Sequence, residues 1–469
     1  MPASAPRYLL VLAAILAAKL TLLAIFDPIP APDSAGYIAY SDAMLAGGAW
    51  LRDAGIHAAA IPVLAFRMMG YPLLISAARL LAGTGWTWLL ALVQIALALL
   101  VLFRLCALRT PLGLSAGALL FALVAIATSS SLVLDATMLS DSLHASLVIL
   151  AITALLRPAL SGRPVGAWAA LGAGLLLAAA FLLREALVYL WLPMLPLLAL
   201  AAGGKRRLAV AALALLPLAA TIVAYSAWNR QRAGTAFVTT GGETTLLQPV
   251  VLASARDPAI FAGTSPLDQA ARQTIKHHDF ADVLDIDQRL FGTWHMTAPE
   301  ISAAAYREYF AAWRGHPAAM ARTVLANLRA NQTFLFFRPI DAVREYILWA
   351  TGRPSELGRW KSVAADWRML PFYLLSQLFR VVSVSLFAAF LLTTPWRAWR
   401  DGRSSAVARA GLALWLLYLG WFAVYAMVHI ETRYMAPVLP FAILFAIANL
   451  LWLRRGKAEG GGAFGGDAA

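Results

Sequence analysis

Charged and aromatic residues gather where the long apolar stretches of the chain end. Asp33 and Tyr37 follow the first stretch, four positions apart. The Asp33 carboxylate has two uses at such a place: it caps a short helix, or it acts as a general base that takes a proton from a bound hydroxyl. Capping would not prevent catalysis, so both interpretations stay open.

Two further sites, at Asp141 and at Arg184-Glu185, each have one functional and one structural interpretation. Asp141 stands in Ser140-Asp141-Ser142, where a later apolar stretch begins. It either caps that helix or is a second acid of the same site. Arg184-Glu185 lies between two stretches with almost no loop, as an ion pair or with the guanidinium free to bind a phosphate bidentately.

The densest group stands near the end of the chain. His429, Glu431, Arg433 and Tyr434 occur within six positions. We expect either a turn at the membrane interface, with side chains reaching toward water, or part of a pocket for a sugar or its acceptor.

Two cations fall inside apolar stretches, Lys19 and Arg380. A charge at such depth is unfavourable and usually faces a partner or a watery cavity. A structural ion pair and a ligand contact are equal alternatives for each.

Other signals are weak. His277-His278-Asp279 and the aspartates after it have no metal-ligand spacing, and we expect a solvated loop there. Asn331-Gln332-Thr333 fits the glycosylation sequon, which chance often produces. The sequence has no Walker motif, so it does not indicate an ATP-driven pump. No cofactor is required by these residues, and a divalent metal is compatible with them but not indicated.

The elements that would hold these residues are membrane helices. The chain has 469 residues, 61% hydrophobic and only 13% charged, whereas soluble domains are about a quarter charged. The apolar residues form blocks of roughly 20, which suffices to cross a ~30 Å hydrocarbon core. The fold class we predict is an all-α polytopic membrane protein with ten spans: Tyr8–Phe26, Trp86–Leu105, Leu112–Thr128, Leu143–Leu156, Ala167–Leu183, Leu187–Ala202, Leu208–Trp228, Pro371–Thr393, Leu412–Val428 and Met435–Leu453.

Loop charges give the orientation. The net charge of +14 comes mostly from Lys and Arg in alternate short loops, as expected for cytoplasmic loops, and so does not indicate nucleic-acid binding. Both termini are therefore predicted in the cytoplasm. The cations that define this side are Arg104, Arg109, Arg157, Arg163, Lys205, Arg206, Arg207, Arg397, Arg400, Arg403, Arg409, Arg454, Arg455 and Lys457.

Two large regions are then predicted outside. The first, 27–85, belongs to an N-terminal membrane module, 1–228, and its apolar part Ile61–Leu81 is expected on the membrane surface or as a re-entrant element. The second, 229–370, is expected to form a small, mainly helical extracytoplasmic domain that contains an amphipathic helix over Pro317–Phe337. A C-terminal membrane module with a cytoplasmic tail, 371–469, follows.

Four of these pieces, in order, resemble the GT-C membrane glycosyltransferases, in the family 39 branch that includes protein O-mannosyltransferases and lipid A aminoarabinose transferases. They are Asp33 with Tyr37, the Arg67 to Pro72 segment with its Gly-Tyr-Pro, Ser140-Asp141-Ser142, and Glu431 to Tyr434 followed by Pro437 and Pro440. Leu182-Leu183-Arg184 and Asn229 to Gly242 are supporting similarities. One departure is Ser34, where many relatives carry a second acid.

The resemblance implies an inverting transfer of a sugar from a polyprenyl phosphate to an acceptor hydroxyl on the outer face of a bacterial cytoplasmic membrane. It implies Asp33 as base with Asp141 as the other catalytic acid. Partners would be the lipid-linked donor, a glycan, lipid or protein acceptor, and membrane lipids. The expected roles are phosphate binding by Arg67, Arg184, Arg380 and Arg433, and sugar or acceptor binding by Tyr37, His429, Glu431 and Tyr434.

Two other classes remain. A lipid or sugar transporter fits intramembrane Lys19 and Arg380, although polar groups on one face suit a midplane site poorly. A glycan polymerase or ligase of similar fold would differ mainly in its acceptor.

Overall fold

The computed structural model describes residues 5–31, 33–47, 57–58, 61–62, 66–129, 131–201, 207–331, 339–402 and 404–460. Predictions on Pro32, on the charges of Lys205, Arg206 and Arg403, and on residues 332–337 lie outside them.

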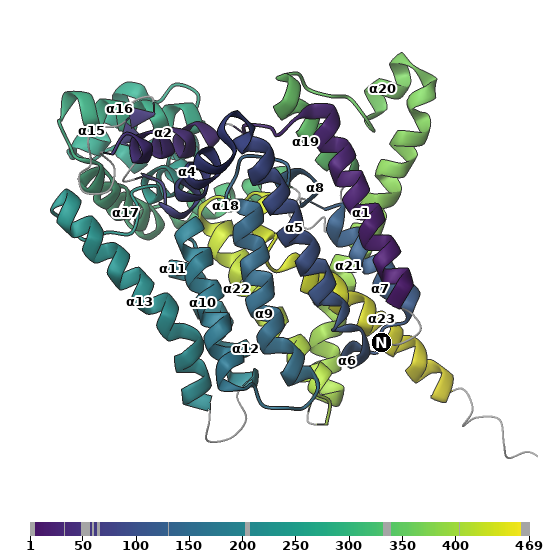
Figure 1. The fold of residues 1–469 in the computed structure, drawn as a ribbon. Helices are drawn as coiled ribbons and strands as arrows, with labels where there is room; N and C mark the ends of the chain where they lie inside the picture. Colours follow the sequence, from purple (N-terminus) through teal and green to yellow (C-terminus); the bar gives the residue numbers. More distant parts are fainter. Residues whose placement is uncertain are drawn as a thin grey trace, which may run out of the picture.

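Long helices run side by side between two ends of a bundle (Figure 1). The N-terminal module contributes α1 (Ala5–Phe26), α5 (Trp86–Cys106), α6 (Arg109–Leu112), α7 (Ala116–Ala127), α8 (Ser131–Leu134), α9 (Asp141–Leu160), α10 (Ala167–Leu183), α11 (Leu187–Leu190), η2 (Leu192–Met194), α12 (Leu195–Ala201) and α13 (Arg207–Ala233). The C-terminal module contributes α21 (Leu370–Asp401), α22 (Ala406–Val428), η6 (Thr432–Met435) and α23 (Leu439–Gly460).

The remaining elements gather at one end of this bundle. They are α2 (Ser34–Leu45), α4 (Gly70–Ala82), η1 (Gly83–Gly85), α14 (Gly242–Ser254), η4 (Pro258–Phe261), α15 (Pro266–Thr274), α16 (Phe280–Thr293), α17 (Ala298–Gly315), α18 (Pro317–Asn331), α19 (Pro339–Thr351), α20 (Trp360–Ala365) and η5 (Trp367–Met369). Strands β1 (His57–Ala58) and β2 (Ile61–Pro62) pair antiparallel. The beginning of α1 and the end of α23 both lie at the opposite end (Figure 1).

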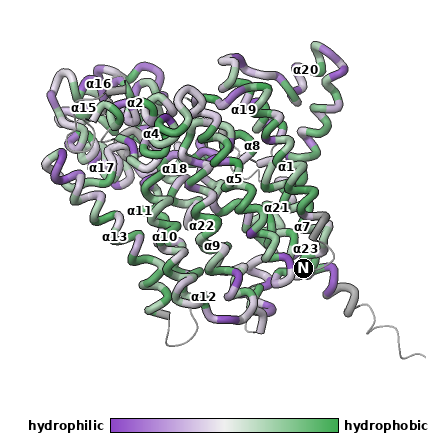
Figure 2. The backbone as a smooth tube through the Cα atoms, viewed as in Figure 1, coloured by the Kyte–Doolittle hydropathy of each residue, from purple (hydrophilic) through white to green (hydrophobic). Residues whose placement is uncertain are grey.

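Six helices of the described residues are long and apolar enough to cross a membrane, so the prediction of a helical membrane protein is confirmed. They are Tyr8–Phe26, Gly70–Cys106, Asp141–Leu160, Leu208–Ala233, Trp367–Asp401 and Ala406–Val428. Figure 2 shows the hydrophobic middle of the bundle and hydrophilic residues concentrated toward its ends. Ten spans remain a prediction, because several of the other helices are shorter.

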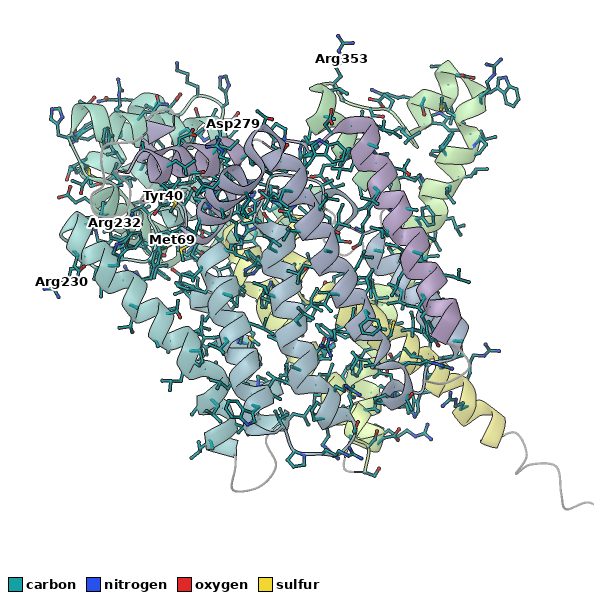
Figure 3. The ribbon with its side chains drawn as sticks, viewed as in Figure 1. Tyr40, Met69, Arg230, Arg232, Asp279 and Arg353 are labelled. Carbon is teal, nitrogen blue, oxygen red and sulfur yellow. The ribbon has the colours of Figure 1, made fainter. Side chains whose placement is uncertain are left out.

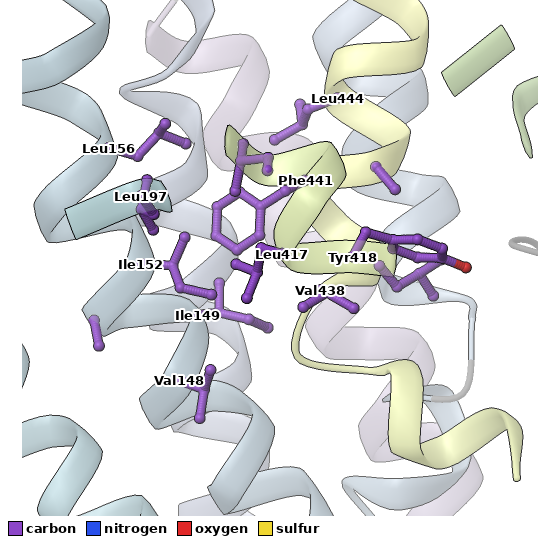
Figure 4. Close-up of a cluster of buried hydrophobic side chains, with 14 of the residues drawn as sticks. Val148, Ile149, Ile152, Leu156, Leu197, Leu417, Tyr418, Val438, Phe441 and Leu444 are labelled. Atoms are coloured by element: carbon purple, nitrogen blue, oxygen red, sulfur yellow. The ribbon is translucent and has the colours of Figure 1, made fainter. Parts of the chain in front are cut away.

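The predicted span Leu187–Ala202 is a helix in three pieces, α11, η2 and α12. Pro193 and Pro196 explain the division, since proline lacks the amide proton that a continuous helix needs. The pieces still pack into the bundle core. Figure 4 shows Leu197 of α12 near Ile152 of α9 and Leu417 of α22, all buried.

The expected outer domain, 229–370, contains two differently packed parts. Helices α14 to α18 share one hydrophobic cluster, which includes Val250, Ile286 and Tyr309. Helix α19 packs instead against α1, where Tyr346 meets Phe26 edge to face with ring centroids 5.2 Å apart. We call α14–α18 the α14–α18 unit.

The acidic run in that unit is not the solvated loop that we expected. Asp279 is the N-cap of α16, and its carboxylate accepts from the amide of Asp282, whose own carboxylate accepts from the Asp279 amide. This capping box satisfies amides that the first turn of a helix leaves without partners. The expected amphipathic helix is α18, which begins at Pro317.

The short helices at the end of the bundle where the smaller elements gather are joined to the long helices by specific contacts. Arg232 Nη1 at the end of α13 donates to Tyr40 Oη of α2 over 3.3 Å, and Figure 3 shows the two side chains. Gly70 starts α4 where any Cβ would collide with the carbonyl of Leu182 at the end of α10. The Gly-Tyr-Pro segment thus needs glycine for a close backbone approach.

Candidate functional site

Six charged residues, predicted from separate parts of the sequence, form one network at the crowded end of the bundle. We call it the arginine–carboxylate cluster. Its members are Asp33, Arg67, Asp141, Arg184, Glu431 and Arg433. They meet because α9 begins, and α10 and α22 end, at this end of the bundle, while Asp33 stands at the start of α2.

Asp33 precedes α2, but its carboxylate does not cap that helix. It accepts hydrogen bonds from Arg67 Nη2 and Arg433 Nη2, each 3.1 Å away. The capping interpretation is therefore wrong for the side chain, although the helix itself is present. The carboxylate is 38% exposed, so it remains accessible to a ligand.

Arg433 connects three acids. Besides Asp33, its guanidinium lies 2.5 Å from Glu431 Oε2 and 3.9 Å from Asp141 Oδ2. The residue lies in η6, between α22 and α23, and its side chain is 15% exposed. The last loop thus contributes a cation in contact with both predicted catalytic acids.

Arg184 pairs with Asp141 and not with Glu185 as the surface ion-pair interpretation supposed. Its guanidinium also lies over the ring of Tyr434, 4.3 Å from the centroid. Asp141 is the first residue of α9, and its N-cap Ser140 makes no capping hydrogen bond. Because an arginine faces both a carboxylate and an aromatic ring, its orientation is fixed.

His429, Glu431 and Tyr434 extend the cluster along the same loop. His429 Nε2 lies 2.9 Å from Glu431 Oε1, and Tyr434 Oη donates to that oxygen over 3.3 Å. The Tyr434 ring stacks on Tyr425 of α22 with centroids 4.7 Å apart. The four residues that crowd the sequence here therefore belong to one network of contacts.

Tyr37 adjoins the cluster and is buried. Its hydroxyl is 3.0 Å from Ser140 Oγ, its ring meets Tyr71 edge to face, and Arg67 lies over it at 4.9 Å. Tyr37 is thus held by buried contacts and connects α2 to the start of α9.

The charges and hydrogen bonds around Asp33 and Glu431 keep both carboxyl groups ionised. Burial by itself would raise the pKa of Asp33, but the charges of Arg67 and Arg433 outweigh it and bring the pKa below its usual value. Burial likewise opposes ionisation of Glu431, yet the hydrogen bond from His429 and the charge of Arg433 lower its pKa to about 2. Burial raises the pKa of Tyr37, so this tyrosine stays protonated at neutral pH.

A buried network that was not predicted from the sequence lies behind the cluster. Gln94 of α5 is fully buried, donates to the carbonyls of Asp135 and Thr137 over 3.1 and 2.9 Å, and accepts from Tyr71. Ile29 forms a parallel β-bridge with Thr137. These contacts hold residues 134–140, and through them the backbone next to Asp33 and Asp141.

Lys19 forms an ion pair with Asp135, which is the structural one of its two predicted alternatives. Its Nζ lies 2.6 Å from Asp135 Oδ2, and both side chains are almost fully buried. Ser142, the neighbour of Asp141, donates to the other oxygen of Asp135. A cavity of about 40 Å³ beside this pair has further serines, Ser129 and Ser146, in its wall.

Arg380 lies away from these partners, on α21. It is 3.8 Å from Asp341 of α19, which also pairs with Arg344. Its predicted role in phosphate binding therefore has a structural alternative, the linkage of α19 to α21.

Within the described residues, no group of three or more His, Cys, Asp and Glu side chains is arranged to hold a metal ion. Comparison with models of protein families, with curated proteins and with solved structures finds no match for this chain.

Proposed function

We propose that the protein is an inverting glycosyltransferase that moves a sugar from a polyprenyl-phosphate carrier to an acceptor hydroxyl at the outer face of a bacterial cytoplasmic membrane. The observation that carries the proposal is an ionised, accessible Asp33 within a group of three arginines, at one end of an apolar helical bundle. A base and phosphate-binding cations are the two things this chemistry needs.

In the proposed reaction, the Asp33 carboxylate takes the proton of the acceptor hydroxyl. The hydroxyl oxygen forms a bond to the anomeric carbon from the face opposite the phosphate. The bond between that carbon and the phosphate oxygen breaks, and its electron pair leaves with the polyprenyl phosphate. The phosphate already carries charge, so the step calls for cationic stabilisation and does not by itself demand a metal.

The arginines supply that stabilisation. Arg67, Arg184 and Arg433 are balanced in the cluster by the charges of Asp33, Asp141 and Glu431. A bound phosphate would compete with these carboxylates for bidentate contacts. Arg184 suits this role because Tyr434 supports its guanidinium face, and Arg433 because it already spans the cluster.

In this proposal the α14–α18 unit would contribute to the acceptor side. Tyr309 Oη donates to the carbonyl of Met427 over 3.0 Å, two residues before His429. Tyr189 of α11 and Tyr306 of α17 also contact each other through their hydroxyls. The unit thus packs against the end of α22, from which the loop with His429, Glu431 and Tyr434 continues.

The transporter alternative gains no support from the intramembrane cations on which it relied. Lys19 and Arg380 both lie beside aspartates of the protein, Asp135 and Asp341. Such pairs are what a structural role requires.

Two substitutions separate binding from transfer. Asp33→Asn should bind a polyprenyl-phosphate sugar as the unchanged protein does, yet transfer it at least 100-fold more slowly, because general-base catalysis contributes about that factor or more. Arg184→Gln should bind the donor roughly 10- to 100-fold more weakly, since a hydrogen bond to a charged group contributes about 1.5–3 kcal/mol. Donor binding and transfer would be measured on the same preparations. Full transfer by Asp33→Asn would exclude this base, and unaltered donor binding by Arg184→Gln would exclude this phosphate contact.

A further inference from the structure

A second arrangement of arginines lies toward the end of the bundle opposite the arginine–carboxylate cluster, where the last turns of α21 contact α23 (Figure 1). Arg397 and Arg400 of α21 both place their guanidinium carbons 5.3 Å from the ring centroid of Trp452 on α23. Arg455, one turn beyond Trp452, is exposed and donates to the carbonyl of Gly113 over 3.0 Å. We call these four residues the Trp452 arginine site.

Arg397 is held in place by neutral groups. Its Nη1 donates to Asn449 Oδ1 over 3.0 Å, and Asn449 in turn donates to Thr394 Oγ1 over 3.0 Å, with both partners buried. Its Nε is also buried and has no hydrogen-bond partner among the described residues. A buried donor without a partner is unfavourable, so this guanidinium is oriented but not fully satisfied.

The charge of this site is unbalanced. Two guanidinium groups share one ring, and among the described residues the carboxylate that pairs with them is Asp401, 3.7 Å from Arg400. Like charges repel each other, and an anion bound between them would offset the repulsion. Arginine, with its planar fork of donors, matches the oxygens of a phosphate.

The depth of the site indicates the source of that phosphate. Trp396 and Trp399 are 51% and 78% exposed on the same turns of α21, and their rings lie 5.3 Å apart. Exposed tryptophans at the end of an apolar helix are typical of the level of lipid headgroups. The arginines between them and α23 would therefore lie at that level.

We propose that the Trp452 arginine site binds the phosphodiester of an anionic phospholipid headgroup. Basic pockets between membrane helices recognise such headgroups by charge and geometry together. The site is remote from the arginine–carboxylate cluster, so the proposal does not depend on the proposed transferase activity.

The test counts bound lipids on the purified full-length chain by native mass spectrometry, after it is offered equal amounts of phosphatidylglycerol and phosphatidylcholine. The unchanged protein should retain phosphatidylglycerol selectively. The double variant Arg397→Gln/Arg400→Gln should bind it roughly 30-fold more weakly, because each cation near an anionic headgroup contributes about a fivefold gain. Arg400→Gln alone, at a side chain 56% exposed, should show about a fivefold loss and avoids disturbing the buried contacts of Arg397.

The matched control is Arg157→Gln/Arg163→Gln, which removes the same charge from exposed arginines at the end of α9. It should leave phosphatidylglycerol binding unchanged. Equal retention of both lipids by the unchanged protein, or an equal loss in the control pair, would overturn the proposal. Addition of inorganic phosphate should not release the lipid, and release by millimolar phosphate would identify a simple anion site instead.

Discussion

Asp33, the proposed base, combines two properties that oppose each other in that role. The neighbouring Arg67 and Arg433 keep it ionised and ready to accept a proton, but the same charges reduce its affinity for that proton. A donor phosphate that drew Arg433 away would restore basicity at the moment when the acceptor must be deprotonated. The activity should therefore depend on pH in a way that these neighbouring charges determine.

The pH dependence of kcat/KM should follow from the lowered pKa of Asp33. Because a base is inactive when protonated, activity should stay constant from about pH 8 to pH 5 and fall only below about pH 4. Arg67→Gln removes one of the two cations, so the acid limb should move upward by about 1 pH unit. Arg157→Gln, far from the cluster, is the control. An acid limb that stays in place in Arg67→Gln would show that Asp33 does not set the profile.

Residue types and positions were enough to name most of the cluster from the sequence, since polar side chains at the ends of apolar helices have few structural uses. Pairing was beyond that reasoning. Arg184 contacts Asp141, 43 positions away, and not its neighbour Glu185. Gln94 was missed because a single amide in an apolar helix has no periodic signal.

At the scale of elements, the buried pairs fix where the helices meet. Residues 134–140 have little regular structure, yet Gln94, Lys19 and the bridge to Ile29 determine their path. The sequence predicted helix positions well because apolar length is a strong local signal. It could not predict the broken α11–α12 segment as easily, since prolines are tolerated in membrane helices when neighbours satisfy the backbone.

Lys19 and Asp135 should stabilise the fold only when both are charged and paired. Lys19→Met leaves a buried carboxylate alone and should lower the free energy of unfolding by about 3–5 kcal/mol. Lys19→Met/Asp135→Asn keeps an acceptor for Ser142 without charge and should recover most of that loss. Thermal unfolding in detergent would measure both. A double variant less stable than either single one would argue against an ion pair here.

Asp287 of α16 should make the α14–α18 unit sensitive to pH. Its carboxyl is 5% exposed, neither oxygen has a hydrogen-bond partner among the described residues, and burial raises its pKa to about 7. The folded unit therefore favours the protonated form. Its stability should be highest below about pH 4 and decline as the pH rises to 7, by about 4 kcal/mol at 1.36 kcal/mol per pKa unit.

Asp287→Asn should remove this decline and raise the midpoint of thermal unfolding at pH 8. The control is Asp285→Asn, an exposed acid on the same helix, which should unfold as the unchanged protein does. An unaltered pH profile in Asp287→Asn would mean that other groups set the stability of the unit.

At the scale of the whole molecule, the two ends of the bundle differ in what they hold. Acids and arginines are paired at one end, and mostly arginines with tryptophans lie at the other. This asymmetry agrees with the loop charges from which we predicted cytoplasmic termini. Apolar composition predicted the class of fold, whereas the number of spans depends on short helices whose length alone does not decide it.

Cysteine labelling would test this orientation. In a Cys106→Ala background, Thr264→Cys in the α14–α18 unit should react with a membrane-impermeant maleimide in intact cells. Thr264 is exposed to solvent, and the unit is predicted on the outer side of the membrane. Ser161→Cys, exposed after α9, should react only after the cells are opened. Reversed labelling, or labelling of both from outside, would contradict the predicted topology.

The central claim is that the arginine–carboxylate cluster transfers a sugar from a lipid phosphate. The most direct measurement is an in vitro reaction of the purified protein with a panel of radiolabelled polyprenyl-phosphate sugars and a membrane extract as acceptor. We expect label to enter the acceptor with release of polyprenyl phosphate from one donor, and transfer at least 100-fold slower by Asp33→Asn. A folded protein that neither binds nor consumes any lipid-linked sugar would contradict the claim.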